Sequence, residues 1–201
     1  MFRGNACPNW AILSGEPYVG LCIHQMATEL DTGPIILRDQ FSLSDSTYIG
    51  DVYSWFESCL PSMFCEAIEG LASGSLTPKT QPTDPSLALR CYPRRSSDGR
   101  IDWNNSGETV TRLIRASSHP FDGAFSFCEK GQLIKIWRAE IVEHQGAFLA
   151  IPGQICFRIA GDPVIASNDS MVRLIEIELE DGTSGVEAKK MVGKNLRSRL
   201  M

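Results

Sequence analysis

The feature that most constrains the fold of this 201-residue chain is a short polar segment between two apolar runs. Residues 19–23 form the first run and residues 35–37 form the second. Short apolar runs bounded by turn residues are typical of buried strands, so we predict strands at 19–26 and 34–43. The connection between them carries Asp31 immediately before a Thr-Gly-Pro turn. In α/β proteins such connections often display a functional carboxylate.

Two helices are expected in the first part of the chain. Residues 7–14 carry apolar side chains at helical spacing and stop at Gly15, which predicts a short helix. A cluster of N-cap residues at 44–46 opens a longer apolar pattern that reaches Leu71. Pro61 lies inside this pattern and is expected to kink the helix or break it in two, because proline removes a backbone hydrogen bond.

The composition of the chain changes after residue 76. A stretch rich in proline and threonine predicts a linker. A short helix at 108–117 follows, and then several short β-type runs separated by Gly, Asp and Asn turns, which favour a small sheet or barrel. The domains expected from this pattern are an α/β domain at 1–76, a linker at 77–87, a mainly β domain at 88–185 and a basic tail at 186–201.

Charge, hydropathy and cysteine usage limit the class of protein. The net charge is −5, which argues mildly against a large polyanionic partner. No apolar run approaches the roughly 20 residues that span a bilayer, and the first residues lack a signal-peptide pattern, so we expect a cytoplasmic protein with no membrane partner. The seven cysteines contain no C-x-x-C pair and no zinc-type cluster with histidine. We therefore expect reduced thiols in the core and no metal.

Two strings in the first part carry the most specific information. The first runs from Phe2 to Glu16 and reads F-R-G-N-A-C-P-N-W-A-I-L-S-G-E; the second runs from His24 to Pro34 and reads H-Q-M-A-T-E-L-D-T-G-P. Taken alone, the first is a loop leading into an amphipathic helix and the second is a turn. Together, in this order and spacing, they resemble the formyltransferase family that uses 10-formyltetrahydrofolate.

The second half carries further strings in the order of the same family. They are Y-P-R-R at 92–95, I-D-W at 101–103, P-F-D-G-A-F at 120–125, L-I-K-I-W at 133–137 and P-G-Q-I at 152–155. They are similar to the OB-like β-barrel domain that follows the catalytic domain in methionyl-tRNA formyltransferases and in some amino-sugar formyltransferases. The resemblance implies the C-terminal part of a Rossmann-like formyltransferase domain followed by an OB-like barrel domain.

The resemblance also implies a set of site residues. In that family an Asn and a His from an upstream N-x-H-x-S-L-L-P segment and the Asp of L-D-T-G form the catalytic trio. Asp31 matches this aspartate, which orients the imidazole and helps to accept the proton of the attacking amine. The backbone of Glu29 and Leu30, with Asp31, is expected beside the pterin ring of 10-formyltetrahydrofolate, the formyl donor.

The chain departs from the family pattern at its start. No N-x-H-x-S-L-L-P segment precedes Phe2, and the first half of the parallel sheet is missing with it. We hypothesise an N-terminally truncated formyltransferase whose activity on its own is in question. His24 matches a family position and is not expected to replace the catalytic His, while His119 and His144 read as surface residues. An unpaired sheet edge predicts aggregation or a homo-oligomer for residues 2–76.

The acceptor of the formyl group is open at this point. Methionyl-tRNA needs a basic surface for its phosphates, but residues 86–185 carry 11 Lys/Arg and 13 Asp/Glu, a net charge of about −2. A nucleotide-linked amino sugar needs only a few cations for its diphosphate, so we favour the amino sugar over tRNA as the second small-molecule partner beside the folate. A non-catalytic binding module is the alternative from a different class, because the catalytic Asn and His are not in the sequence.

Overall fold

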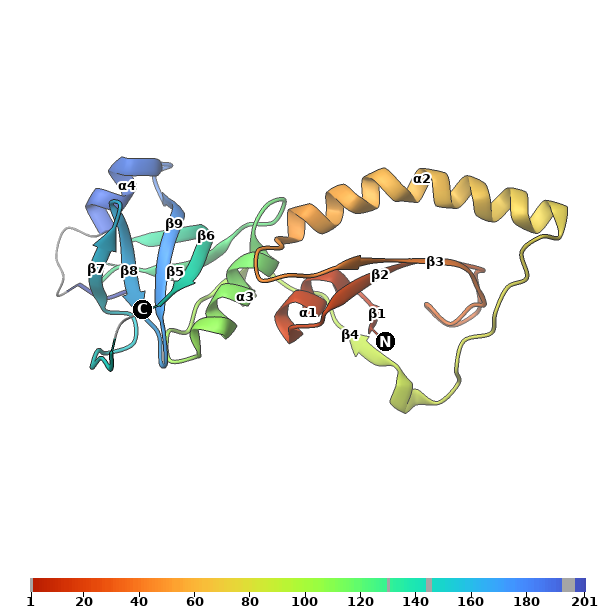
Figure 1. The fold of residues 1–201 in the computed structure, drawn as a ribbon, viewed down its shortest axis with the longest axis horizontal. Helices are drawn as coiled ribbons and strands as arrows, with labels where there is room; N and C mark the ends of the chain where they lie inside the picture. Colours follow the sequence, from red (N-terminus) through yellow and green to blue (C-terminus); the bar gives the residue numbers. More distant parts are fainter. Residues whose placement is uncertain (1, 130, 144–145, 193–197) are drawn as a thin grey trace. The chain divides into compact units, whose positions relative to one another are not determined.

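The structure, a computed structural model, describes residues 2–129, 131–143, 146–192 and 198–201. The chain divides into two compact units, Met1–Arg94 (unit 1) and Arg95–Met201 (unit 2). Figure 1 labels the helices and strands of both. Every helix in the described ranges is too short or too polar to cross a bilayer.

Unit 1 combines paired strands with helices. In chain order its elements are β1 (Phe2–Gly4), α1 (Cys7–Ser14), β2 (Tyr18–His24), β3 (Ile35–Ser42), α2 (Ile49–Ser73), the 3-10 turn η1 (Pro85–Leu87) and β4 (Leu89–Cys91). β2 and β3 form an antiparallel hairpin, and β1 pairs in parallel with β4. The strands and helices predicted in this part are confirmed. The pairing of β1 with β4 was not predicted, because the two strands lie far apart in the chain.

The long helix α2 lies along the β2–β3 hairpin (Figure 1). Val52 is fully buried on the covered face, and the ring of Trp55 lies 5.4 Å from that of Phe41 on β3. Proline at position 61 was expected either to kink the helix or to break it in two. The helix continues through Pro61, so the break does not occur. Pro61 has no N–H to donate to the carbonyl of Glu57. Both residues are exposed, so water can hydrogen-bond this carbonyl.

The residues predicted as a linker, 77–87, belong to unit 1 and pack against it. The backbone groups of Lys79 and Ile35 exchange two hydrogen bonds, at 2.8 and 2.7 Å. Gln81 is only 8% exposed. The start of β3 offers unpaired backbone groups to this segment, so a proline-rich stretch with few N–H donors still finds partners there.

Unit 2 is built on an antiparallel sheet with the strand order β5-β6-β9-β8-β7 in its described part. The strands are β5 (Ala124–Phe127), β6 (Leu133–Val142), β7 (Ile155–Ile159), β8 (Asp162–Ala166) and β9 (Met171–Leu179), and the helical elements are η2 (Ser96–Gly99), α3 (Gly107–Ser117) and α4 (Gly185–Val192). Ile134, Leu174 and Ile177 are fully buried in its core. The helix predicted at 108–117 is confirmed as α3, which begins after the N-cap Ser106.

The end of the chain lies against both outer strands of this sheet. The N–H of Ile155 donates to the carbonyl of Ser198 at 3.1 Å, and Phe127 and Met201 exchange two backbone hydrogen bonds at 3.0 and 2.8 Å. The described part of the predicted tail at 186–201 therefore includes most of α4 and this paired end. A mixed α/β and mainly β architecture is confirmed. The closed OB-like barrel stays a prediction, because the described end of the chain, residues 198–201, joins the sheet through isolated bridges and not as a strand.

Candidate functional site

The site predicted from the sequence lies in the loop between β2 and β3, at residues 25–34. The loop is pinched at its base, where the N–H of Gln25 donates to the carbonyl of Pro34 at 2.9 Å. Inside the loop the hydroxyl of Thr32 donates to the carbonyl of Glu29 at 2.9 Å. Asp31 has a φ of 62°, in the left-handed region that aspartate tolerates better than most residues. These contacts give the loop one defined path.

Gly33 is required by the pinched base of the loop. A Cβ at this position would lie 1.7 Å from the carbonyl oxygen of Gln25. The same oxygen lies 2.9 Å from Nδ1 of His24, where a protonated Nδ1 donates to it. His24 thus contacts the base of the loop, and its expected structural role stays a prediction.

The carboxylate of Asp31 is held by the backbone of β1. Its Oδ2 accepts a 2.8 Å hydrogen bond from the N–H of Gly4. Gly4 has a φ of 101° and a Cβ there would lie 2.6 Å from the carbonyl oxygen of Cys91, so glycine is needed for the approach. Asp31 is half-buried, and a carboxylate in this position keeps further lone pairs with which to accept a proton or to orient an imidazole.

A second contact to the loop comes from Gln81, which the sequence analysis placed in the linker and did not single out. Its Nε2 donates to the carbonyls of Asp31 and Gly33, at 3.0 and 2.7 Å. Its Oε1 accepts a 2.9 Å hydrogen bond from Nη2 of Arg3. Local sequence carries little signal for Gln81, because its loop partners lie 48 and 50 residues away.

Glu29 and Leu30, the other predicted site residues, lie on the exposed side of the loop. Leu30 is 65% exposed, and Met26 in the same loop is 96% exposed. The carbonyl of Glu29 is already used by Thr32. The structure therefore brings Glu29 and Leu30 together with Asp31 in one loop, and their contact with a pterin stays a prediction.

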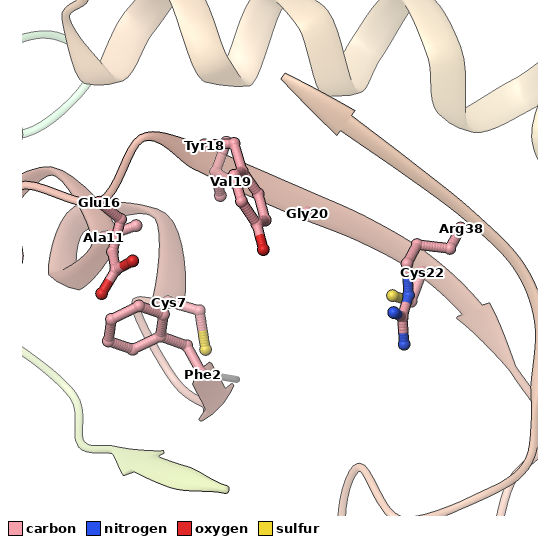
Figure 2. A pocket seen from close by; sticks show the side chains of 9 residues that line it. All are labelled: Phe2, Cys7, Ala11, Glu16, Tyr18, Val19, Gly20, Cys22 and Arg38. Carbon is pink, nitrogen blue, oxygen red and sulfur yellow. The ribbon is translucent and has the colours of Figure 1, made fainter. Parts of the chain in front are cut away.

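Unit 1 contains a cavity of about 270 Å³, and none of the loop residues 25–34 is among the residues that line it. Figure 2 shows its lining side chains, among them Phe2, Cys7, Tyr18 and Arg38. Burial, followed by the nearby Cys91 thiol and the Asp31 carboxylate, raises the pKa of the Cys7 thiol to about 12. Cys7 is therefore a protonated thiol at neutral pH and not a nucleophile.

The described part of the chain contains no group of three or more His, Cys, Asp or Glu side chains arranged to hold a metal ion. The cysteines in this part are free thiols, and they include the buried Cys91. The chemistry available around Asp31 is thus that of a carboxylate, backbone amides and a buried side-chain amide. Such groups can move protons and orient polar ligands.

Comparisons with known proteins place both halves of the chain in one group. Residues 1–68 match the family Formyl transferase, and residues 94–192 match Formyl transferase, C-terminal domain. Methionyl-tRNA formyltransferase of Clostridium tetani is 29% identical over 177 residues, which cover 88% of this chain and 55% of that protein. The enzyme of the same name from Thermodesulfovibrio yellowstonii is 28% identical over 191 residues, covering 95% and 58%. The chain thus spans little more than half the length of these curated relatives.

Solved structures share the fold. A crystal structure of a HypX variant from Aquifex aeolicus has a TM-score of 0.69 at 21% identity and covers 96% of this chain and 33% of that one. The N-formyltransferase of Helicobacter canadensis, in complex with folinic acid and dTDP-3-aminofucose, has a TM-score of 0.61 at 17% identity and covers 86% and 61%. Both family models that match belong to one class of proteins, the formyl transferases. The chain belongs to the formyltransferase family.

Proposed function

We propose that unit 1 supplies the aspartate and part of the folate-binding surface of a site that transfers a formyl group from 10-formyltetrahydrofolate to an amine. The observation that carries this proposal is the carboxylate of Asp31, oriented by the N–H of Gly4 in a loop with one defined path. Among the structural neighbours, HypX from Aquifex aeolicus has been solved with tetrahydrofolic acid and the Helicobacter canadensis enzyme with folinic acid. These complexes support a folate as the donor.

The chemistry assigns Asp31 a defined task. The attacking amine must lose a proton as it adds to the formyl carbon, and negative charge develops on the formyl oxygen. A carboxylate held at one oxygen can orient an imidazolium and help to accept the proton. The sequence contains no N-x-H-x-S-L-L-P segment, so the Asn and His of the family pattern are not among its residues. The exposed Leu30 and the backbone of Glu29 are proposed to lie against the pterin ring.

For the acceptor we propose a nucleotide-linked amino sugar. The low positive charge of residues 86–185 supports this choice, since a diphosphate needs few cations. Sugar N-formyltransferases also occur among the structural neighbours. Methionyl-tRNA is the second candidate, favoured by the names of the curated relatives.

The proposal is tested first by binding. Titration calorimetry with folinic acid, a stable formyl folate, is expected to show saturable binding to the chain. Asp31→Ala is expected to weaken this binding at least tenfold, whereas Asp45→Asn, at an exposed position near the start of α2, leaves it unchanged. Absence of binding to the unsubstituted chain would contradict the proposed site.

The acceptor is tested by transfer assays. The chain is incubated with 10-formyltetrahydrofolate and either a dTDP-linked amino sugar or methionyl-tRNA, and formylated product is measured. We expect slow transfer by these 201 residues, because the Asn and His of the family pattern are not among them, and any product is expected on the amino sugar. Turnover equal to that of a complete enzyme would show that these two residues are not needed. Product on the tRNA alone would select the second candidate.

A further inference from the structure

The side chain of Gln81 is buried between the Asp31 loop and the N-terminal strand β1. It is 8% exposed, and among the described residues it makes three hydrogen bonds, each to a residue of unit 1. Two of them reach the carbonyls of Asp31 and Gly33, on either side of Thr32. The third ties Gln81 to Arg3, the residue directly before Gly4. One side chain therefore contacts both the Asp31 loop and a residue of β1, the strand that contains Gly4.

The chemistry of this position fits glutamine and few other residues. A carboxamide combines donors on its nitrogen with an acceptor on its oxygen, and here both kinds are used. Glutamate would keep the acceptor for Arg3 but would point an oxygen at two carbonyls. Lysine or arginine would donate to the carbonyls but would repel the Arg3 guanidinium. Nη2 of Arg3 donates to Gln81, whereas Nε of Arg3 is buried without a hydrogen-bond partner within the described residues.

The two carbonyls determine the path of the backbone at Asp31. With its φ at 62°, Asp31 needs contacts on both sides to stay in the left-handed region. A backbone fixed at residues 31 and 33 aims the Asp31 carboxylate at the N–H of Gly4, 2.8 Å away. We propose that Gln81 is a positioning residue, which sets the orientation of the Asp31 carboxylate through the loop backbone. Its importance for formyl transfer rests on the proposed function.

The test uses the Gly4 amide as a reporter. In the full chain labelled with ¹⁵N, the Gly4 amide is expected to be protected from hydrogen exchange, and its signal is expected to shift when Asp31→Ala removes the acceptor of its hydrogen bond. Gln81→Met keeps the length of the side chain but removes its hydrogen bonds, and Gln81→Glu keeps only the contact with Arg3. Gln40→Glu, at an exposed position of β3, is the matched control.

We expect exchange at Gly4 to be about tenfold faster in both Gln81 variants, since each loses at least two hydrogen bonds. The shift of the Gly4 amide that Asp31→Ala causes is lost when the substitution is made in the folded Gln81 variants and is kept when it is made in the control. A residue that only filled space would leave this shift intact in Gln81→Met, and that result would overturn the proposal. If Gln81→Met does not fold, the Gly4 shift is measured in Gln81→Glu instead. Its loss there supports the proposal, and its retention overturns it.

Titration with folinic acid separates this inference from the proposed function. Weaker binding by the Gln81 variants, together with the lost Gly4 shift, supports both. If the Gln81 variants lose the Gly4 shift but neither they nor the unsubstituted chain binds folinic acid, the positioning role is supported and the proposed function is contradicted. An unchanged Gly4 shift with normal folinic acid binding contradicts the positioning role alone.

Discussion

The N–H of Gly4 donates a 2.8 Å hydrogen bond to the carboxylate of Asp31, across 27 residues of sequence. The bond joins the two strings whose order and spacing gave the resemblance to formyltransferases, so the strings are neighbours in space as well as landmarks in the sequence. A carboxylate oriented in this way has already met part of the entropic cost of alignment before any ligand arrives. This contact is the structural basis of the proposed site.

The base of the Asp31 loop, closed by the hydrogen bond between Gln25 and Pro34, is expected to tolerate no side chain at Gly33. Gly33→Ala places a Cβ 1.7 Å from the carbonyl oxygen of Gln25 and forces the hydrogen bond between Gln25 and Pro34 to open. We expect a loss of about 3 kcal/mol in the stability of unit 1, the upper part of the usual range for a point mutation. This loss is measured by urea unfolding, with the hydrogen exchange of the amides in residues 2–94 as the readout.

The matched control is Gly20→Ala on the neighbouring strand β2. Its Cβ would meet the carbonyl oxygen of Asp39 at 3.8 Å, an ordinary contact. The control is therefore expected to cost little or to stabilise slightly. Equal stability of the Gly33 and Gly20 variants would mean that the base of the loop is open in solution.

The outer face of α2 is expected to drive self-association. Leu60, Phe64 and Ile68 follow one another at a spacing of four residues and are 42%, 54% and 53% exposed. An apolar stripe of this kind on a helix is typical of an interaction surface. Sedimentation velocity is expected to show association that grows with concentration, and the double variant Phe64→Gln, Ile68→Gln is expected to reduce it.

Glu57→Gln and Glu66→Gln, two exposed positions on the same helix, serve as controls that should leave the association unchanged. Helix content by circular dichroism checks that the double variant still folds. A chain that sediments as a monomer at every concentration would refute the homo-oligomer expected from the sequence.

Unit 2 is expected to lose stability in acid through Asp162. Burial opposes the charge of this carboxyl, but hydrogen bonds from Lys189 and Arg173 outweigh it and hold the pKa of Asp162 below its ordinary value. The ion pairs measure 2.6 Å to Lys189 and 2.7 Å to Arg173. Because the folded-state pKa is lowered, the stabilisation is complete above the unfolded-state pKa of about 4 and is lost as the pH falls through the folded-state value.

Asp162→Asn is expected to cost about 3 kcal/mol at pH 7, since it leaves two cations facing a neutral group in a buried position. The variant should also lose less stability than the unsubstituted chain when the pH is lowered from 5 to 3. Urea unfolding of unit 2 at several pH values measures both effects. Parallel pH dependence in the two proteins would contradict the assignment to Asp162.

The features that the sequence predicted depend on local patterns. The strands β2 and β3 and the position of Asp31 between them follow from apolar runs and turn residues within about 25 positions. The features that it did not predict depend on distant partners. Gln81 reaches carbonyls 48 and 50 residues away, and β1 pairs with β4 near residue 90. Pro61 shows a further limit, because its effect depends on whether the freed carbonyl faces water or the core.

The most direct test of the central claim is a titration of the ¹⁵N-labelled chain with folinic acid, observed at the amides of Gly4 and residues 29–31. We predict saturable shifts at these amides that disappear in Asp31→Asn. The side-chain oxygen of this variant can still accept from the N–H of Gly4, so its fold is expected to be kept. Shifts confined to other parts of the chain, or identical shifts in the Asp31→Asn variant, would contradict the central claim.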